Sequence, residues 1–217
     1  FNFKELFNLY NSNKEKITDE VSLYLINNRK VKFILGDKKN IKITTKDDLN
    51  YLKSENYYGI GFDIHRLIKN KKLFLGGKKI PFHSGLKGHS DGDVILHAII
   101  DGLLGAMRKG DIGKLFPSNS NKFKNIRSKN MLLPVLNLLN DNNFSINNID
   151  INLICENPKV SKIRNKITKS LSRLLSINRN LINLKGKTVE KLGIIGKEQA
   201  IACEVICSLS KWKKLTF

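Results

Sequence analysis

The feature that most limits how this chain can fold is its longest apolar stretch, VILHAIIDGLLGAM at residues 94–107. His97 and Asp101 interrupt the stretch, and it is too short to cross a bilayer. Its apolar positions recur with helical period, and Ser90, with Asp93 three residues later, is a plausible N-cap. We therefore predict a helix that begins at Ser90 and continues through this stretch.

Strands and helices alternate along the chain from residue 57 onwards. Period-two patterns and β-branched residues predict strands at 57–65, 148–158, 180–187 and 200–209, and a hairpin with a Gly-Gly turn at 72–82. Amphipathic patterns predict further helices at 130–143, with Pro134 near the first turn, and at 159–177. This alternation indicates an α/β (α+β) layer in which helices cover one sheet.

The composition changes near residue 55, so we divide the chain into segments 1–55 and 56–217. The first segment is small for a domain of its own. Its patterns predict one or two short helices in 1–26, two strands around a Gly-Asp turn in 30–44, and a short helix leading into a polar linker in 46–56.

The chain carries a formal net charge of +20, which would favour binding to any polyanion. Its basic residues are scattered from Lys4 to Lys214, and no zinc finger, aromatic RNA-binding motif or basic-region heptad is present. We interpret most of this charge as solvated surface, compatible with an anionic substrate, and predict no nucleic-acid partner.

The chain has three cysteines, an odd number without the spacing of a disulfide framework. A reducing compartment therefore fits best. Cys203 and Cys207 would suit either a metal pair or two small buried thiols, and their strongly apolar surroundings favour the second interpretation.

Asp63 and His65 lie two positions apart in a predicted strand, so their side chains would point to the same face. Together with His97 they would supply three nitrogen and oxygen ligands, the number found in a catalytic zinc site with one open position. Asp101, one turn beyond His97, would orient the imidazole. An exposed polar face and an ordinary core histidine are the alternatives on spacing alone.

Five blocks occur in a fixed order: GIGFDIH, then GLKGHSDGDVILHAIIDGLLGA, then GDIGKLFP, then NPK, and finally TVEKLGIIG with AIACE. In this order and spacing, residues 58–210 resemble the 2-C-methyl-D-erythritol 2,4-cyclodiphosphate synthases. The resemblance implies a mixed, mainly four-stranded sheet covered by helices on one face. It also implies a homotrimer with active sites between neighbouring subunits.

The resemblance implies a role for each matching residue. Asp63, His65 and His97 would bind Zn²⁺ or another divalent cation at the same site, and Glu190 would bind Mg²⁺ or Mn²⁺ at the diphosphate. His89 and Thr188 would stabilise the transition state. The remaining matches imply substrate contacts at Ser90, Asp111, Ile112, Gly113, Phe116, Pro117, Ser118, Asn119, Ser120, Cys155, Glu156, Asn157, Pro158, Lys159, Val160, Ser161, Lys187, Val189, Ile194 and Lys197.

The chain departs from the family pattern at three places. Ser118, Asn119 and Ser120 stand where an acidic pattern is usual, and Lys187-Thr188-Val189 stands where relatives carry a run of threonines. Lys197 occupies a position often held by arginine, which keeps the charge but loses bidentate phosphate geometry.

Residues 18–52 resemble the C-terminal end of 2-C-methyl-D-erythritol 4-phosphate cytidylyltransferase, with Thr18 and Lys42 at positions that contact a substrate phosphate. That family's glycine-rich nucleotide loop is absent from this sequence. Our hypothesis is that the chain, which opens on Phe1, is the C-terminal part of a bifunctional protein. A diverged extension that only packs or links is the alternative.

The family resemblance implies a lyase of non-mevalonate isoprenoid biosynthesis. The 2-phosphate of 4-diphosphocytidyl-2-C-methyl-D-erythritol 2-phosphate would attack its own β-phosphorus, expelling CMP and closing the cyclodiphosphate. We expect a cytidine diphosphate substrate, a fused or associated cytidylyltransferase and no membrane partner. The expected location is the cytoplasm, or a plastid-like organelle in a eukaryote. The alternatives are a nucleic-acid-binding protein or a pathway scaffold that has lost catalysis on the same fold.

Overall fold

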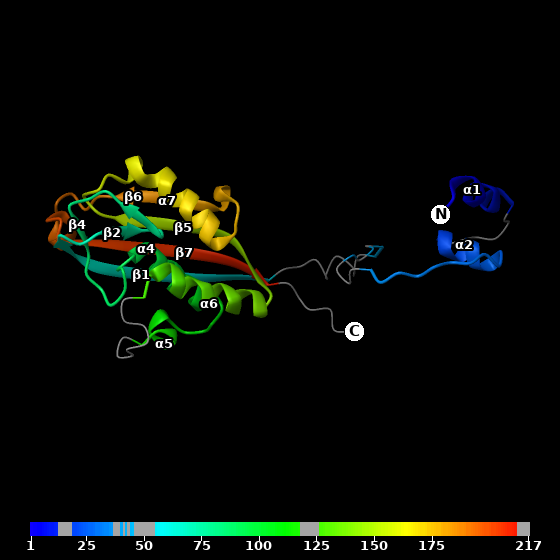
Figure 1. The fold of residues 1–217 in the computed structure, drawn as a ribbon, viewed down its shortest axis with the longest axis horizontal. Helices are drawn as coiled ribbons and strands as arrows, with labels where there is room; N and C mark the ends of the chain where they lie inside the picture. The colour runs from blue at the N-terminus through cyan, green and yellow to red at the C-terminus, as the bar shows by residue number, and fades with distance from the viewer. Residues whose placement is uncertain are drawn as a thin grey trace. The chain divides into compact units, whose positions relative to one another are not determined.

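The computed structural model describes residues 1–12, 19–36, 40, 42, 44–45, 55–117 and 126–211. The chain divides into two compact units, Phe1–Thr45 and Lys46–Phe217, and Figure 1 draws the ribbon of both. Compactness does not show what each unit does, so the boundary placed after residue 55 stays a prediction. No helix among the described residues has the length and apolar character needed to span a bilayer.

The first unit contains two short helices, α1 (Phe3–Ser12) and α2 (Glu20–Ile26). Asp19 caps α2 by accepting a hydrogen bond from Ser22 N at 2.8 Å. The buried Tyr24 of α2 donates from Oη to Glu5 Oε2 of α1 at 3.3 Å, which joins the two helices. These helices confirm the prediction for residues 1–26.

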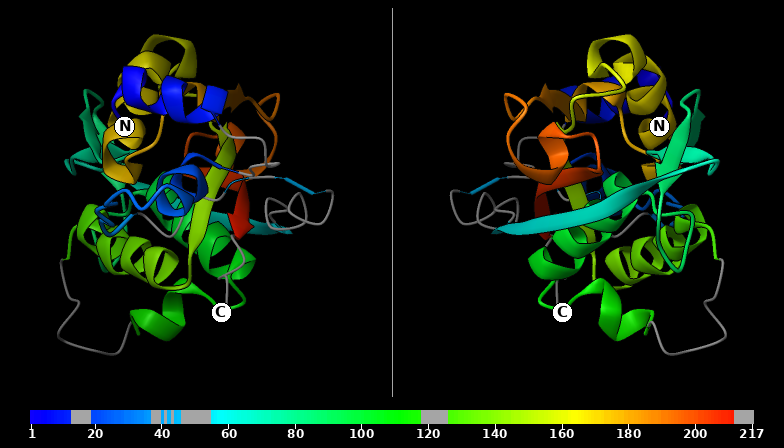
Figure 2. Two further views of the ribbon diagram at one scale, coloured as in Figure 1. Left: turned by 90° about the vertical axis from the view of Figure 1, so that its right-hand side faces the viewer. Right: turned by 90° about the vertical axis from the view of Figure 1, so that its left-hand side faces the viewer.

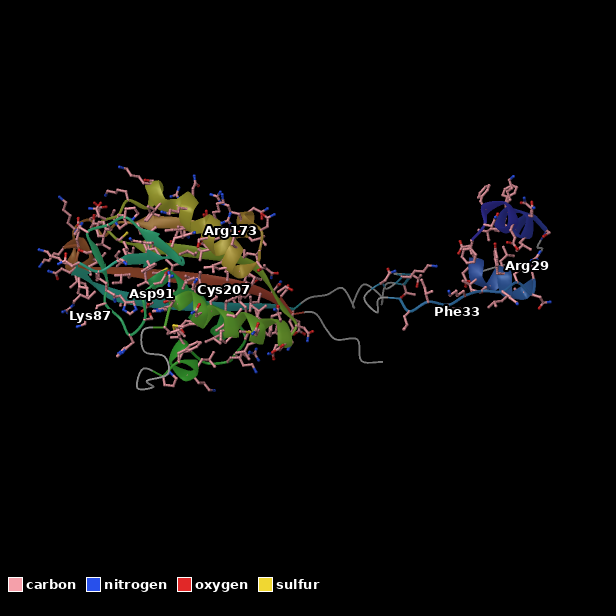
Figure 3. The ribbon with its side chains drawn as sticks, in the orientation of Figure 1. Arg29, Phe33, Lys87, Asp91, Arg173 and Cys207 are labelled. Carbon is pink, nitrogen blue, oxygen red and sulfur yellow. The ribbon has the colours of Figure 1, made fainter. Side chains whose placement is uncertain are left out.

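The two strands predicted at 30–44 are absent from the described residues of that stretch. Phe33, labelled in Figure 3, is 76% exposed, and Ile34 and Leu35 are also exposed. An isolated two-stranded hairpin is marginal in water, so β-propensity alone does not produce one here. The helix predicted at 46–56 lies outside the described residues, except for Glu55 and Asn56, which open a strand.

The second unit alternates strands and helices. Its elements are β1 (Glu55–Lys69), β2 (Leu73–Leu75), β3 (Lys78–Ile80), β4 (Ser84–Leu86), α4 (Val94–Ala106), α5 (Ile112–Leu115), α6 (Ser128–Asp141), β5 (Phe144–Ile154), α7 (Val160–Leu175), the 3₁₀ turn η2 (Arg179–Leu181), β6 (Ile182–Lys187), α8 (Gly193–Gly196) and β7 (Ala200–Lys211).

Five strands form one mixed sheet in the order β4-β1-β7-β5-β6, and β2 and β3 form a separate hairpin. β7 lies between β1 and β5 and is antiparallel to both, whereas β5 and β6 are parallel. The α/β prediction is confirmed, with one strand more than expected. That strand, β4, is only three residues long and pairs with the end of β1, so it has too few residues to show an alternating pattern.

Helices cover one face of this sheet. α4 packs on β1 and β7, α7 packs on β6, and α4 and α6 lie side by side, as the end-on views of Figure 2 show. On β7, the thiol of Cys207, labelled in Figure 3, points to α4 and lies 3.9 Å from Ile99 O. The opposite face of β1 exposes four large apolar side chains: Tyr58, Ile60, Phe62 and Ile64.

The helix predicted from Ser90 begins later, at Val94. Asp93 is its N-cap and accepts a hydrogen bond from Leu96 N at 3.2 Å. Gly92, with a φ of +73°, keeps the preceding residues out of the helix. Pro134 was predicted near the first turn of its helix but lies in the interior of α6, because α6 already begins at Ser128.

Candidate active site

Two glycines of β1 bring α4 unusually close to the sheet. A Cβ on Gly61 would lie 1.8 Å from Ala98 O, and one on Gly59 would lie 2.0 Å from Gly102 O. Only a residue without a side chain permits this separation of strand and helix. Because Asp63 and His65 share the face of Gly61, the approach carries His97 of α4 towards both of them.

Asp63, His65 and His97 meet at this contact, as the sequence predicts. Asp63 Oδ2 lies 2.8 Å from His97 Nδ1 and 3.0 Å from His65 Nε2, and the two ring nitrogens are 3.2 Å apart. Of the described residues, these three form the one group of histidine, cysteine and acidic side chains arranged to hold a metal ion.

The donor set and its spacing fit a divalent cation. A tetrahedral ion with bonds of about 2.1 Å separates its ligand atoms by about 3.4 Å. The separations of 2.8, 3.0 and 3.2 Å between the three side chains need only a small opening to reach that value. Two imidazoles and one carboxylate are ligands that zinc accepts in sites with an open fourth position.

The charges at this site favour a cation. Burial would raise the pKa of Asp63, but hydrogen bonds from His65 and His97, with their charges, outweigh it and lower the pKa to about 2. Burial disfavours protonated His97, yet the hydrogen bond and charge of Asp63, with smaller effects from Asp93 and Asp91, raise its pKa. The field that stabilises a proton on His97 would also stabilise a metal ion between these atoms.

The sequence pattern of the YgbB family matches residues 57–210 of this chain, a range that contains all three candidate ligands. The chain belongs to the YgbB family. Together with the named relatives, this match confirms the resemblance to the cyclodiphosphate synthases that the five motif blocks indicated.

Named relatives agree with this membership. A 2-C-methyl-D-erythritol 2,4-cyclodiphosphate synthase of Clostridium acetobutylicum is 48% identical over 151 residues, covering 70% of this chain and 97% of the relative. A bifunctional enzyme IspD/IspF of Pelagibacter ubique is 47% identical over 211 residues, or 97% of this chain. The chain spans 57% of the length of that bifunctional relative.

Solved structures give the same result. IspF of Plasmodium falciparum in a CDP complex has a TM-score of 0.64 and 41% identity, covering 73% of this chain and 97% of that one. The bifunctional IspDF of Campylobacter jejuni has a TM-score of 0.71 and 33% identity, covering 97% of this chain and 58% of that one. The match to bifunctional proteins thus extends into the residues before the YgbB region.

A second group of predicted site residues lies where the β5–α7 loop meets the loop after β6. Glu156 Oε1 accepts hydrogen bonds from Val189 N at 3.1 Å and Lys191 N at 3.4 Å, on either side of Glu190. Glu190 has a φ of +52°, a conformation that a non-glycine residue adopts only when its surroundings hold it. Its carboxylate accepts a hydrogen bond from Thr188 Oγ1 at 2.9 Å.

The residues around Glu156 differ in exposure. Cys155 is buried, and burial raises the pKa of its thiol to about 11, so the thiol faces the core rather than solvent. Val160 is also buried, and a Cβ on Gly186 would lie 2.6 Å from its Cβ. The other members are partly or fully exposed: Asn157, Pro158, Lys159, Ser161, Lys187, Ile194 and Lys197.

A third group lies in and around α5. Asp101 Oδ1 accepts a hydrogen bond from Ile112 N at 2.7 Å, so Asp101 positions the Asp111–Gly113 turn rather than His97, which corrects its predicted role. Asp111 caps α5 through Lys114 N at 2.9 Å. Phe116 is half-buried, Pro117 and His89 are exposed, and Ser118–Ser120, like Thr18, lie outside the described residues.

Cys203 and Cys207 do not form a metal pair. Both are fully buried and free, and burial raises the pKa of both thiols, that of Cys207 to about 12. The buried-thiol interpretation is therefore confirmed.

Two residues at the site were missed from the sequence. Ser128 Oγ lies 2.9 Å from His97 Nε2, and Asp91 accepts a short hydrogen bond from the same hydroxyl. Asp91 lies in the HSDGD block, whereas Ser128 lies far from it in the sequence. No pattern in the sequence connects Ser128 with His97, so only the packing of α6 beside α4 identifies it.

Proposed function

We propose that this chain is a 2-C-methyl-D-erythritol 2,4-cyclodiphosphate synthase that uses zinc at Asp63, His65 and His97. The observation that carries the proposal is the convergence of these three ligand atoms, all within 4.8 Å of one another, in a chain of the YgbB family. The substrate would be 4-diphosphocytidyl-2-C-methyl-D-erythritol 2-phosphate, and the products the cyclodiphosphate and CMP.

In this reaction the protein forms no covalent bond with the substrate. The nucleophile, the 2-phosphate, is already part of the substrate, so the chain has to fold the substrate until that oxygen reaches the β-phosphorus. The bond between the β-phosphorus and the bridging oxygen then breaks, and the oxygen leaves with CMP. A bound divalent cation would supply Lewis-acid stabilisation of the phosphoryl charge.

The other site residues are proposed to have the roles that the family resemblance implies. Thr188 and the exposed His89 would donate hydrogen bonds to phosphoryl oxygens. Glu190, held between the two amides that Glu156 binds, would hold Mg²⁺ or Mn²⁺ at the diphosphate. The residues from Cys155 to Ser161 would form the cytosine pocket, with Lys159 exposed at the start of α7.

We further propose a homotrimer with its active sites between subunits. The exposed apolar face of β1 supports this: Tyr58, Ile60 and Phe62 are 67%, 70% and 55% exposed in the single chain. Ile206 of the neighbouring β7 extends the same patch. A contiguous exposed apolar patch of this kind is typical of a surface that another protein chain covers. The N-terminal unit is proposed to be part of a fused cytidylyltransferase, as in the bifunctional relatives.

The experiment is CMP release from the named substrate, with zinc and magnesium present, by the wild-type chain and by His97→Ala. We expect release by the wild type and its loss in the variant, together with loss of bound zinc. A zinc-loaded wild-type chain that releases no CMP would contradict the proposal and favour the nucleic-acid-binding or scaffold alternative.

A further inference from the structure

The far side of His97 carries a hydrogen-bond chain that the catalytic proposal does not use. His97 Nδ1 faces Asp63 and His65, while Nε2 lies 2.9 Å from Ser128 Oγ and 3.1 Å from Ser90 Oγ. Ser128 is completely buried as the first residue of α6. Asp91, labelled in Figure 3, lies on the loop that leads into α4 and receives the Ser128 hydroxyl proton.

The direction of these hydrogen bonds can be worked out from the groups involved. An ionised carboxylate only accepts, and Asp91 Oδ1 accepts from both the hydroxyl and the backbone N–H of Ser128, the latter at 3.1 Å. The other oxygen of Asp91 lies 3.6 Å from Arg127 Nε. Ser128 has one hydroxyl proton, so towards His97 its oxygen offers only a lone pair.

Ser128 therefore favours a hydrogen on His97 Nε2. Ser90 Oγ, the other neighbour of Nε2, fits this arrangement because its own proton can go to Ser128 Oγ, 3.4 Å away. A neutral imidazole has one N–H, so the lone pair then belongs to Nδ1, the atom that faces Asp63 and His65. This is the tautomer that a metal ion at the site requires. Ligating histidines in general donate their other N–H to an acceptor, which fixes the ring and makes the ligating nitrogen more basic.

We propose that Asp91 and Ser128 are a positioning pair that holds His97 in its metal-binding tautomer and so raises the affinity of the Asp63–His65–His97 group for a divalent cation. This inference rests on the metal role in the proposed function. It adds two residues that touch neither the metal ligand atoms nor the reacting phosphates.

A purely structural role is the competing explanation. Asp91 also accepts from the backbone N–H of Ser128 at the start of α6, so the pair helps to begin that helix. A helix cap alone would change the free energy of unfolding and leave the metal affinity of the folded protein unaltered. The test therefore needs a readout of metal binding and one of the imidazole itself.

The experiment uses the full chain, stripped of metal and titrated with Co²⁺ against a competing chelator. Wild type, Ser128→Ala and Asp91→Asn are compared, with Ser170→Ala as a control because Ser170 is a buried serine in α7. We expect Ser128→Ala to bind Co²⁺ about 10- to 100-fold more weakly, the usual loss for a partner of a ligating histidine. Ser170→Ala should match the wild type.

Asp91→Asn keeps the shape of the loop and tests the pair if Ser128→Ala does not fold. Its amide can donate to Ser128 Oγ, which frees the hydroxyl proton for Nε2 and favours the wrong tautomer, so its affinity should fall as well. Nitrogen-15 NMR of the zinc-loaded wild type should show the hydrogen on His97 Nε2.

The outcomes separate the two proposals. A wild-type chain that binds no Co²⁺ overturns the metal site and this inference together. A wild type that binds, with both variants equal to it in affinity, overturns the positioning pair and leaves the metal site standing. Weaker binding in the variants with an unchanged control supports both.

Discussion

Gly61→Ala should disable the metal centre through the backbone, without touching a ligand. The added Cβ would lie 1.8 Å from Ala98 O, 2.7 Å from Ala98 C and 2.8 Å from Gly102 N. A carbon and a carbonyl oxygen come no closer than about 3.3 Å, so β1 and α4 must separate by about 1.5 Å. All three obstructing atoms are backbone atoms of a buried helix, which cannot move aside as a side chain would.

The effect on the site follows from the position of His97, next to Ala98 on the same helix. A shift of about 1.5 Å greatly exceeds the tolerance of about 0.2 Å in metal–ligand distances. It would stretch the 2.8 Å separation between Asp63 Oδ2 and His97 Nδ1 beyond coordination of one ion. We expect zinc affinity to fall by at least about 100-fold and the free energy of unfolding by about 3 kcal/mol, the upper end for overpacking.

Gly105→Ala is the matched control, because it adds the same methyl group to the same contact. The nearest atoms to its Cβ would be Gly59 Cα at 3.8 Å and Ile60 O at 3.9 Å, which are ordinary van der Waals distances. In a helix this change stabilises by up to about 1 kcal/mol. Chelator competition and denaturant unfolding measure both quantities. Zinc affinity and stability of Gly61→Ala equal to those of the wild type would refute the close-approach argument.

Three further predictions concern charge and backbone contacts. In the chain stripped of metal, the pKa of His97 is raised above 6.5, so the stability from its pairing with Asp63 is fully present below pH 6.5 and is lost as pH rises through the raised value. Denaturant unfolding at several pH values should show this loss of stability. Zinc affinity should rise over the same pH range, because zinc binding displaces a proton from His97. A zinc affinity that does not depend on pH would contradict the raised pKa of His97. Asp93→Ala should reduce the free energy of unfolding by about 3 kcal/mol, because two buried N–H groups at 2.9 and 3.2 Å and a partly buried one at 2.6 Å lose their acceptor. Equal stability of this variant and the wild type in urea would refute that role. Glu156→Ala should raise the magnesium concentration for half-maximal CMP release about tenfold by freeing the amides beside Glu190, whereas Glu156→Gln, which keeps an acceptor oxygen, should stay near the wild type. Equal magnesium dependence in the wild type and both variants would mean that the hydrogen bonds from Val189 N and Lys191 N to Glu156 do not position Glu190.

The sequence predicts the secondary structure of the second unit well, because period-two and helical patterns are long and unbroken there. It places Asp63 and His65 on one face of a strand from alternation alone. The exact start of α4 could not be predicted from the sequence, because Ser90 and Asp93 are both good N-cap residues. The choice between them depends on the backbone conformation of Gly92. The sequence also predicted strands at 30–44 from local β-propensity. Residues with high β-propensity form a strand only where they can pair and pack with neighbouring strands.

The candidate site also has a part that the sequence predicts and a part that it does not. The three candidate metal ligands follow from the motif blocks that resemble the family, whereas the partners that hold them depend on packing between distant segments. Asp101 is one turn from His97 and was expected to orient it, but its carboxylate binds Ile112 N. Ser128 instead reaches His97, from 31 positions further along the chain. Tertiary contacts of this kind leave no periodic or local signal in a single sequence.

The measurement that tests the central claim most directly is the fate of solvent oxygen during turnover in water enriched in oxygen-18. In the proposed reaction the substrate's own 2-phosphate attacks the β-phosphorus, so neither CMP nor the cyclic product takes oxygen from water. Mass spectrometry should therefore find both products unlabelled and in equal amounts. An oxygen-18 atom in CMP or in an open bisphosphate would show that water is the nucleophile, and the chain would then be a hydrolase and not a cyclodiphosphate synthase.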